Sequence, residues 1–258
     1  MKKYLLLFSL LSFLSMVQAQ QSDTLLVKPE HINTSILIPG THRWLVYFKA
    51  GKDSSRTRFN IWTRKIDMIQ YRGKEAVSVT QEWENNDTIL HTVYTVCDRK
   101  DFSTLYQKSW SKTSGTWEFD FIDKTFKLNG TLVDATDTLR VHTGMRKAFE
   151  SATGQYTLDW HLDLEVFPLL PYQAGRVFGI NYYDPGFSAP KLVYYTVTGS
   201  AVIKGYNGQD IDCWLLSHDA SAQNHELFYI SKKTKEVLQL EQEYGGRYRY
   251  KVKLAFSN

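Results

Sequence analysis

The sequence predicts a mainly β protein, one large antiparallel open half-barrel that forms a meander with little helix. Segments with a hydrophobic period of two recur along most of the chain, as in half-buried strands. Short turns rich in Gly, Asn, Asp and Lys separate these segments. Aromatic residues make up 14% of the sequence and sit among Val, Ile and Thr, which favour a pleated surface. These three observations together favour one broad sheet.

The first nineteen residues have the features of a cleavable signal peptide. A positive start, Met1-Lys2-Lys3, precedes an apolar run over residues 4–17, and Val17-Gln18-Ala19 suits a signal peptidase. The alternative is a membrane anchor, which requires about 20 apolar residues, more than this run supplies. We therefore expect an exported protein, periplasmic or extracellular, without a transmembrane segment after cleavage. Removing nineteen of the 258 residues leaves a single half-barrel domain over residues 20–258.

Six strands are expected in the first half of the chain. Residues that tolerate left-handed backbone conformations lie between them, and Asn129-Gly130 is the strongest hairpin signal in the sequence. Short connections of this kind predict antiparallel neighbours. The expected strands are residues 44–49, 58–71, 76–83, 89–97, 105–110 and 117–122.

The middle of the chain, residues 140–184, is the least regular part. Residues 142–150 are compatible with a short helix. Residues 156–166 alternate strictly between polar and apolar side chains and then meet Pro168 and Pro171, which predicts an extended segment ending in a rigid corner.

A second series of strands completes the predicted meander. The expected strands are residues 191–204, 211–217, 226–231, 237–244 and 248–256. In the last of them one face is apolar and the other is cationic, and we expect the cationic face to be solvated because the alternative register buries three cations. The two faces consist of Tyr248, Tyr250, Val252, Leu254 and Phe256, and of Arg249, Lys251 and Lys253.

Charge and motifs exclude several classes of function. The formal net charge of +4 falls to about +2 without Lys2 and Lys3, too little for a nucleic-acid-binding surface. The sequence contains no G-x-S-x-G, G-x-x-x-x-G-K, H-E-x-x-H or C-x-x-C motif. We therefore expect no catalytic residue, no metal and no cofactor, and a protein that is not an enzyme.

One cluster of chemically active residue types needs separate treatment. Asp159, His161, Asp163 and Glu165 share one face if residues 156–166 form a strand. Such a face can hold a divalent cation or an acid/base group, which makes a metal-dependent hydrolase around Asp159 to Glu165 the less favoured alternative. Neighbours on one strand face lie about 6.6 to 7 Å apart, so a solvated strand face is the preferred interpretation.

The two cysteines, Cys97 and Cys213, both lie in apolar, strand-like segments. They either form a disulfide or remain buried and free, because the sequence alone does not show whether their Cα atoms approach within about 7 Å.

The aromatic residues suggest a binding function. Trp residues stand in predicted strands, and a curved sheet covered by residues 140–171 can hold an apolar or lipid-like ligand in its concave face. The alternative is a structural or scaffolding module that contacts an envelope protein partner. The candidate ligand-binding residues are Trp62, Trp83, Trp160, Leu162, Leu164 and Trp214.

Several segments of the chain resemble an uncharacterised family of exported bacterial proteins. The resemblance covers chiefly residues 150–256 and includes Phe167-Pro168-Leu169-Leu170-Pro171-Tyr172, residues 181–186, Asp212-Cys213-Trp214 and residues 227–238. That family is distantly similar to the LolA/LolB lipoprotein-carrier half-barrels, in which an antiparallel sheet curls around a lipid-accepting hollow. The resemblance implies an open, exported half-barrel, whereas its motifs are turns and strands without catalytic signatures.

Overall fold

The computed structural model describes residues 23–254, and these form one sheet of sixteen strands with few helices. The strands are β1 Thr24–Leu26, β2 Gly40–Lys49, β3 Thr57–Tyr71, β4 Lys74–Glu84, β5 Ile89–Asp98, β6 Thr104–Ser111, β7 Gly115–Asp120, β8 Thr125–Leu128, β9 Thr131–Leu132, β10 Leu158–Asp159, β11 Val177–Asp184, β12 Ser188–Lys204, β13 Asp210–Ser221, β14 Asn224–Ser231, β15 Val237–Tyr244 and β16 Arg247–Lys253. The helical elements are α1 Arg140–Thr153, α2 Asp163–Val166 and the 3₁₀ turns η1 Pro29–His31, η2 Thr34–Ile36, η3 Trp160–Leu162 and η4 Phe167–Leu169.

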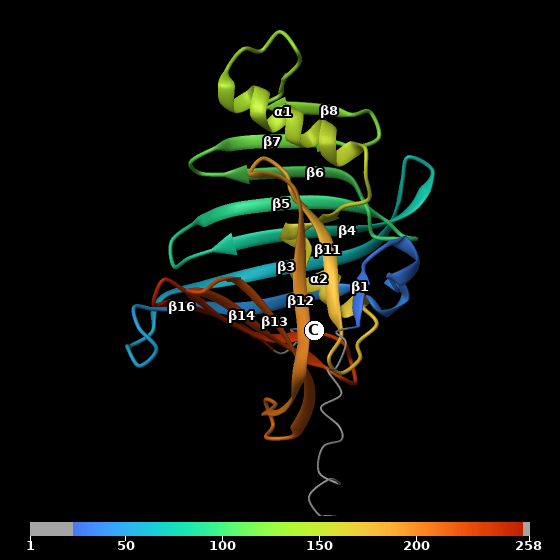
Figure 1. The fold of residues 1–258 in the computed structure, drawn as a ribbon. Coiled ribbons are helices and arrows are strands. Elements are labelled where there is room, and N and C mark those ends of the chain that lie inside the picture. The colour runs from blue at the N-terminus through green and yellow to red at the C-terminus, as the bar shows by residue number, and fades with distance from the viewer. Residues whose placement is uncertain (1–22, 255–258) are drawn as a thin grey trace, which may run out of the picture.

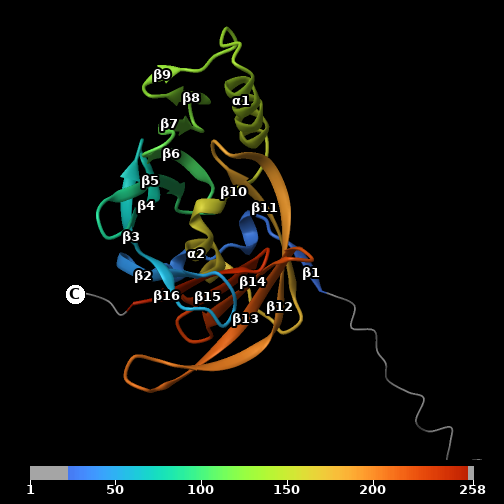
Figure 2. The same cartoon turned by 90° about the vertical axis from the view of Figure 1, so that its left-hand side faces the viewer.

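The strands form one continuous, open sheet. Their order is β1-β11-β12-β13-β14-β15-β16-β2-β3-β4-β5-β6-β7-β8-β9, and β10 pairs with β11 beside this path. The two strand series meet where β16 pairs antiparallel with β2, with Lys251 opposite Val46. Figure 1 shows the stack of strands from β16 and β2 upward to β8, and Figure 2 shows the sheet curling around α2. The predicted mainly β, open half-barrel is confirmed.

Local sequence signals account for most elements. The expected strands are present in the described residues, with ends that differ by a few positions. Asn129 and Gly130 have φ values of 49° and 82°, and they join β8 to β9 as the hairpin signal predicts. The helix expected over residues 142–150 is present as the longer α1.

The interpretation of residues 156–166 as an extended, half-solvated strand is wrong. Only Leu158 and Asp159 form a strand, and the chain then continues through η3, α2 and η4 inside the curled sheet (Figure 2). The Asp159 carboxylate accepts a hydrogen bond from the His161 backbone N–H at 2.9 Å, which caps the first turn. Residues 162–170 are all buried. We call residues 158–170 the inner segment.

The main hydrophobic core lies between the inner segment and the concave face of the sheet. Phe167 is completely buried, and its ring lies 4.9 Å from that of Tyr195 and 4.7 Å from that of Phe228. A second core lies beneath α1, which buries Phe149 and Ala152 against the strands. The inner segment therefore fills the hollow expected from the sequence.

The expected faces of the last strand are also reversed. Lys251 is 3% exposed and lies opposite Val46, which is completely buried, so the cationic face of β16 points inward. On the other face Tyr250 stacks on Tyr47, with ring centroids 4.9 Å apart. The cations are tolerated inside because carboxylates meet them: Asp163 pairs with Lys251, and Glu236 pairs with Lys253.

Other expectations are only partly covered by the described residues. The signal peptide over residues 1–19 and Phe256 of the last expected strand lie outside them. Cys97 and Cys213 are both free and buried. Among residues 23–254, no helix has the length and apolar character needed to cross a membrane.

Candidate functional site

A pocket of about 140 Å³ lies between the concave face of the sheet and the inner segment. Strands β3, β4, β11, β14 and β16 contribute to its walls, together with residues 160–163. We call it the charged pocket. Its lining consists of Trp62, Arg64, Trp83, Trp160, His161, Asp163, Asp184, Glu226, Arg249 and Lys251.

A buried ion network forms the floor of this pocket. Arg64 is 1% exposed and donates to Glu165 at 2.5 Å and to Asp163 at 3.2 Å. The Lys251 ammonium donates to the other oxygen of Asp163 at 3.1 Å. Alternation along the strands brings these groups together, because Arg64 and Lys251 both occupy inward positions of the sheet.

Burial and pairing compete in setting the pKa values of this network. Burial lowers the pKa of Lys251 to about 8, although Asp163 acts in the opposite direction. Burial alone raises the pKa of Asp163, but Lys251 and Arg64 outweigh it, so the pKa lies below its ordinary value. For Glu165 burial prevails over Arg64, and the pKa is raised. The network is held together by charges that are costly to separate.

Two stacked histidines have opposite protonation behaviour. The rings of His91 and His161 lie 5.7 Å apart. Burial and the neighbouring His161 lower the pKa of His91 to about 4. Burial also lowers the pKa of His161, but the adjacent carboxylates of Asp159 and Asp184 outweigh burial and raise the pKa to about 10. At neutral pH the pair consists of a neutral His91 and a charged His161.

The raised pKa of His161 predicts a pH dependence of stability. The folded protein holds this proton up to about pH 10, whereas the unfolded chain releases it near the ordinary histidine pKa of 6.5. The stabilisation is therefore complete below pH 6.5 and decreases as pH rises. Between pH 6.5 and 8 we expect the free energy of unfolding to fall by about 1.6 kcal/mol because of His161. Urea denaturation of the wild type and of His161→Gln measures this slope.

The range from pH 6.5 to 8 separates the contribution of His161 to stability from those of His91 and Lys251. His91 with its lowered pKa favours unfolding below about pH 6.5, and Lys251 makes stability rise with pH from about 8 upward. His161→Gln should lack most of the fall between pH 6.5 and 8, whereas His225→Gln, at an exposed site where a hydrogen bond with Asp219 raises the pKa, should retain most of it. An identical slope in wild type and His161→Gln contradicts the assignment.

An aromatic stack forms one wall of the charged pocket. Trp62 and Trp83 pair across β3 and β4, and their rings are parallel at 4.2 Å. The Lys251 ammonium lies 4.6 Å from the Trp62 ring centroid, and the Arg249 guanidinium lies 5.7 Å from it. The indole face thus holds both cations at the pocket by cation–π contacts.

The unpartnered polar atoms of the pocket are mostly hydrogen-bond donors. Four buried N–H groups lack an acceptor: Trp62 Nε1, Arg64 Nε, Trp83 Nε1 and Arg249 Nε. His161 Nδ1 and Asp184 Oδ1 also lack a well-aligned hydrogen bond, but they form an ion pair at 3.2 Å. Buried donors without partners are rare in native proteins, so this excess points to a missing acceptor.

The sequence-predicted ligand residues separate into three groups. Trp62, Trp83 and Trp160 meet around the charged pocket. Leu162 is completely buried in the main core, and Leu164 faces a different, small pocket beside Trp44. Trp214 lies apart, stacked on Tyr172 at 6.3 Å.

The carboxylates predicted on a solvated face are buried. Asp159 and Glu165 are each 2% exposed. Asp159 accepts from Gln107, and Asp163 and Glu165 face Arg64, so their lone pairs are directed at protein donors. Within residues 23–254 no group of three or more His, Cys, Asp or Glu side chains has metal-binding geometry.

Sequence reasoning missed Arg64, Glu226, Arg249 and Lys251 as site residues. The signal was present as opposite charges in two segments, because the inner segment carries three carboxylates and β16 carries four cations. Both segments were expected to present their charges to solvent, so the carboxylates were not matched with the cations.

Comparisons with known proteins identify a family and leave the activity open. A protein-family model described as "Protein of unknown function (DUF3108)" matches residues 43–253. A crystal structure of a beta-barrel-like protein of domain of unknown function DUF1849 from Brucella abortus aligns with a TM-score of 0.42 and 8% sequence identity, over 84% of this chain and 97% of that chain. No curated protein matches the sequence. The expected family of unknown function is confirmed, whereas export and the likeness to LolA/LolB carriers stay predictions.

Proposed function

The chain belongs to the DUF3108 family of proteins of unknown function, and on this premise we propose that it is an exported, non-enzymatic binding protein. Its binding site is the charged pocket, and its ligand carries an anionic oxygen group, a carboxylate or a phosphate monoester. The observation that carries the proposal is the set of four buried N–H donors without acceptors around one pocket.

Arg249 is the residue best placed to bind the anion. In the described residues no carboxylate lies within 4.0 Å of its guanidinium, in contrast to Arg64 and Lys251. Its Nε is buried and has no acceptor, while Trp62 orients the guanidinium plane. A guanidinium in this state offers charge-assisted, directional hydrogen bonds to an oxyanion.

The size and polarity of the pocket define the ligand class. A volume of about 140 Å³ is small against the 300–1,000 Å³ of most ligand pockets, so it suits a small polar group. The apolar ligand expected in the concave face has no room there because the inner segment fills that space.

Burial raises the pKa of the Cys97 thiol, which supports a function without a cysteine nucleophile.

Replacing Arg249 tests the proposal directly. Titration calorimetry with glycerol 3-phosphate and with propionate should show saturable binding to the wild type. Arg249→Gln should weaken binding of the better probe about tenfold, because a hydrogen bond to a charged group contributes about 1.5–3 kcal/mol.

The control variant lies on the same strand. Arg247→Gln makes the same change in charge at an exposed position outside the pocket lining and should bind like the wild type. Glycerol, which lacks the anionic group, should not bind. Failure of both anions to bind the wild type, or equal losses in the two arginine variants, rejects the proposed site.

A further inference from the structure

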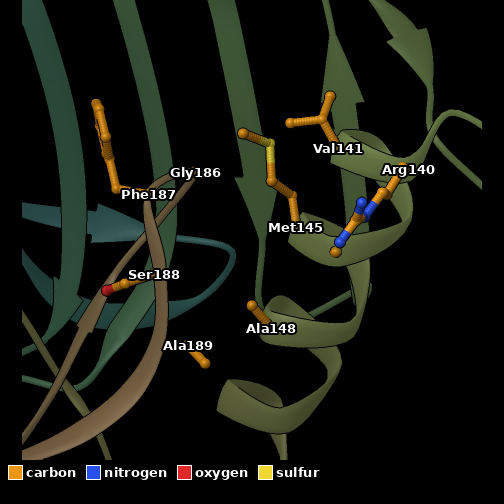
Figure 3. A pocket seen from close by; sticks show the side chains of 9 residues that line it. Arg140, Val141, Met145, Ala148, Gly186, Phe187, Ser188 and Ala189 are labelled. Carbon is orange, nitrogen blue, oxygen red and sulfur yellow. The ribbon is translucent and has the colours of Figure 1, made fainter.

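A second, larger cavity lies beside the charged pocket. It has a volume of about 500 Å³ and separates α1 from the turn between β11 and β12. We call it the α1 groove. Figure 3 shows Met145 pointing from the helix toward the turn and Ala148 facing the same space. The lining consists of Arg140, Val141, Gly144, Met145, Ala148, Gly186, Phe187, Ser188 and Ala189.

The groove has an apolar surface that solvent reaches. Val141 is 58% exposed and Phe187 is 70% exposed, although both side chains are large and apolar. The opposite side of α1 is packed, because Phe149 and Ala152 are buried against the strands. Exposed large apolar side chains beside a cavity are typical of a binding surface.

The α1 groove and the charged pocket share one wall, the turn at residues 184–188. Asp184 lines the charged pocket, and Gly186 lines the groove two residues later. In Figure 3, Phe187 extends from the turn on the side away from the helix. Its ring lies 5.9 Å from that of His161, which lines the charged pocket. Phe187 therefore provides an apolar bridge between the two cavities.

We propose that the ligand is a single-chain anionic amphiphile, with its head group in the charged pocket and its hydrocarbon chain in the α1 groove. This inference rests on the proposed function and names the class of its ligand. Charge complementarity places the head beside Arg249, and the apolar groove next to it matches a chain attached to that head. Arg140 adds a cation to the lining of the groove.

A chain-length series tests the assignment. Butyl, octyl and dodecyl phosphate, and the matching carboxylates, are titrated below their micelle-forming concentrations. Affinity should rise with chain length while added methylenes still enter the groove, by about three- to fourfold per buried CH₂, which corresponds to 0.8 kcal/mol each. The two series distinguish a phosphate head from a carboxylate head.

Gly144 allows the groove to be filled without disturbing the core. A Cβ at this position meets no atom within 4 Å, and the residue lies within α1. Gly144→Trp should remove most of the gain from octyl to dodecyl phosphate and leave glycerol 3-phosphate binding unchanged. The matched control Gly144→Ala should retain the chain-length dependence and should not weaken the helix.

The outcomes separate this inference from the proposed function. Equal affinities for butyl and dodecyl phosphate, or an unchanged series in a folded Gly144→Trp variant, reject the amphiphile while head-group binding stands. Weaker binding of every probe by Arg249→Gln, together with a chain-length gain that Gly144→Trp loses and Gly144→Ala retains, supports both. Thermal denaturation followed by circular dichroism verifies that every variant is folded.

Discussion

Replacement of Arg64 with Met is expected to lower the free energy of unfolding by about 3–5 kcal/mol. Arg64 is 1% exposed and donates to both Glu165 and Asp163 inside the half-barrel. Without the guanidinium, the Glu165 carboxylate loses its cation while it is only 2% exposed, and Asp163 retains only Lys251. Urea denaturation at pH 7 measures the loss.

Two further variants show whether the loss arises from uncompensated charge. Lys65→Met on the same strand removes an exposed pair with Asp67 and should change stability little. Arg64→Met combined with Glu165→Gln should recover part of the loss, because the second change removes the stranded carboxylate. A single Arg64→Met variant as stable as the wild type shows that the ion network does not hold the inner segment.

Replacement of Phe167 with Ala is expected to cost a similar amount, about 3–5 kcal/mol. Phe167 begins η4 and is completely buried. Its ring packs edge-on against those of Tyr195 in β12 and Phe228 in β14. Its removal leaves a cavity that rigid strands cannot close. Denaturation with urea, with an unchanged slope against urea concentration, gives the free-energy difference.

The matched control for this core position is another phenylalanine. Phe187→Ala makes the same change at a side chain that is 70% exposed and should alter stability by less than about 0.5 kcal/mol. Equal effects of the two substitutions indicate that the inner segment is not packed against the sheet as described.

The predicted strands agree with the structure because their signals are local. Residues 58–71 and 76–83 alternate, a short turn joins them, and register follows from the turn and the apolar face. Asn129-Gly130 requires positive φ at both positions, and both have it. These properties depend on residues that are neighbours in the sequence, so a single sequence is enough to predict them.

The candidate site was predicted only in part. Trp62 and Trp83 pair across adjacent strands and were identified as inward-facing ligand residues, since aromatic residues on a buried face are a direct pattern. The sequence pattern assigns Lys251 to solvent, because a charged residue is buried only when a partner offsets its desolvation. That partner, Asp163, lies 88 positions away in the sequence.

The amino-acid sequence by itself determined that this protein is mainly β and where most strands begin and end, and its pattern pointed to Trp62 and Trp83 on an inward face. Only the tertiary structure decided that residues 158–170 enter the half-barrel and that the cations of β16 meet them there. The physical reason is that alternation specifies two faces of a strand but not which face is inside. That choice depends on the free energy of pairing distant charges, which no local pattern contains.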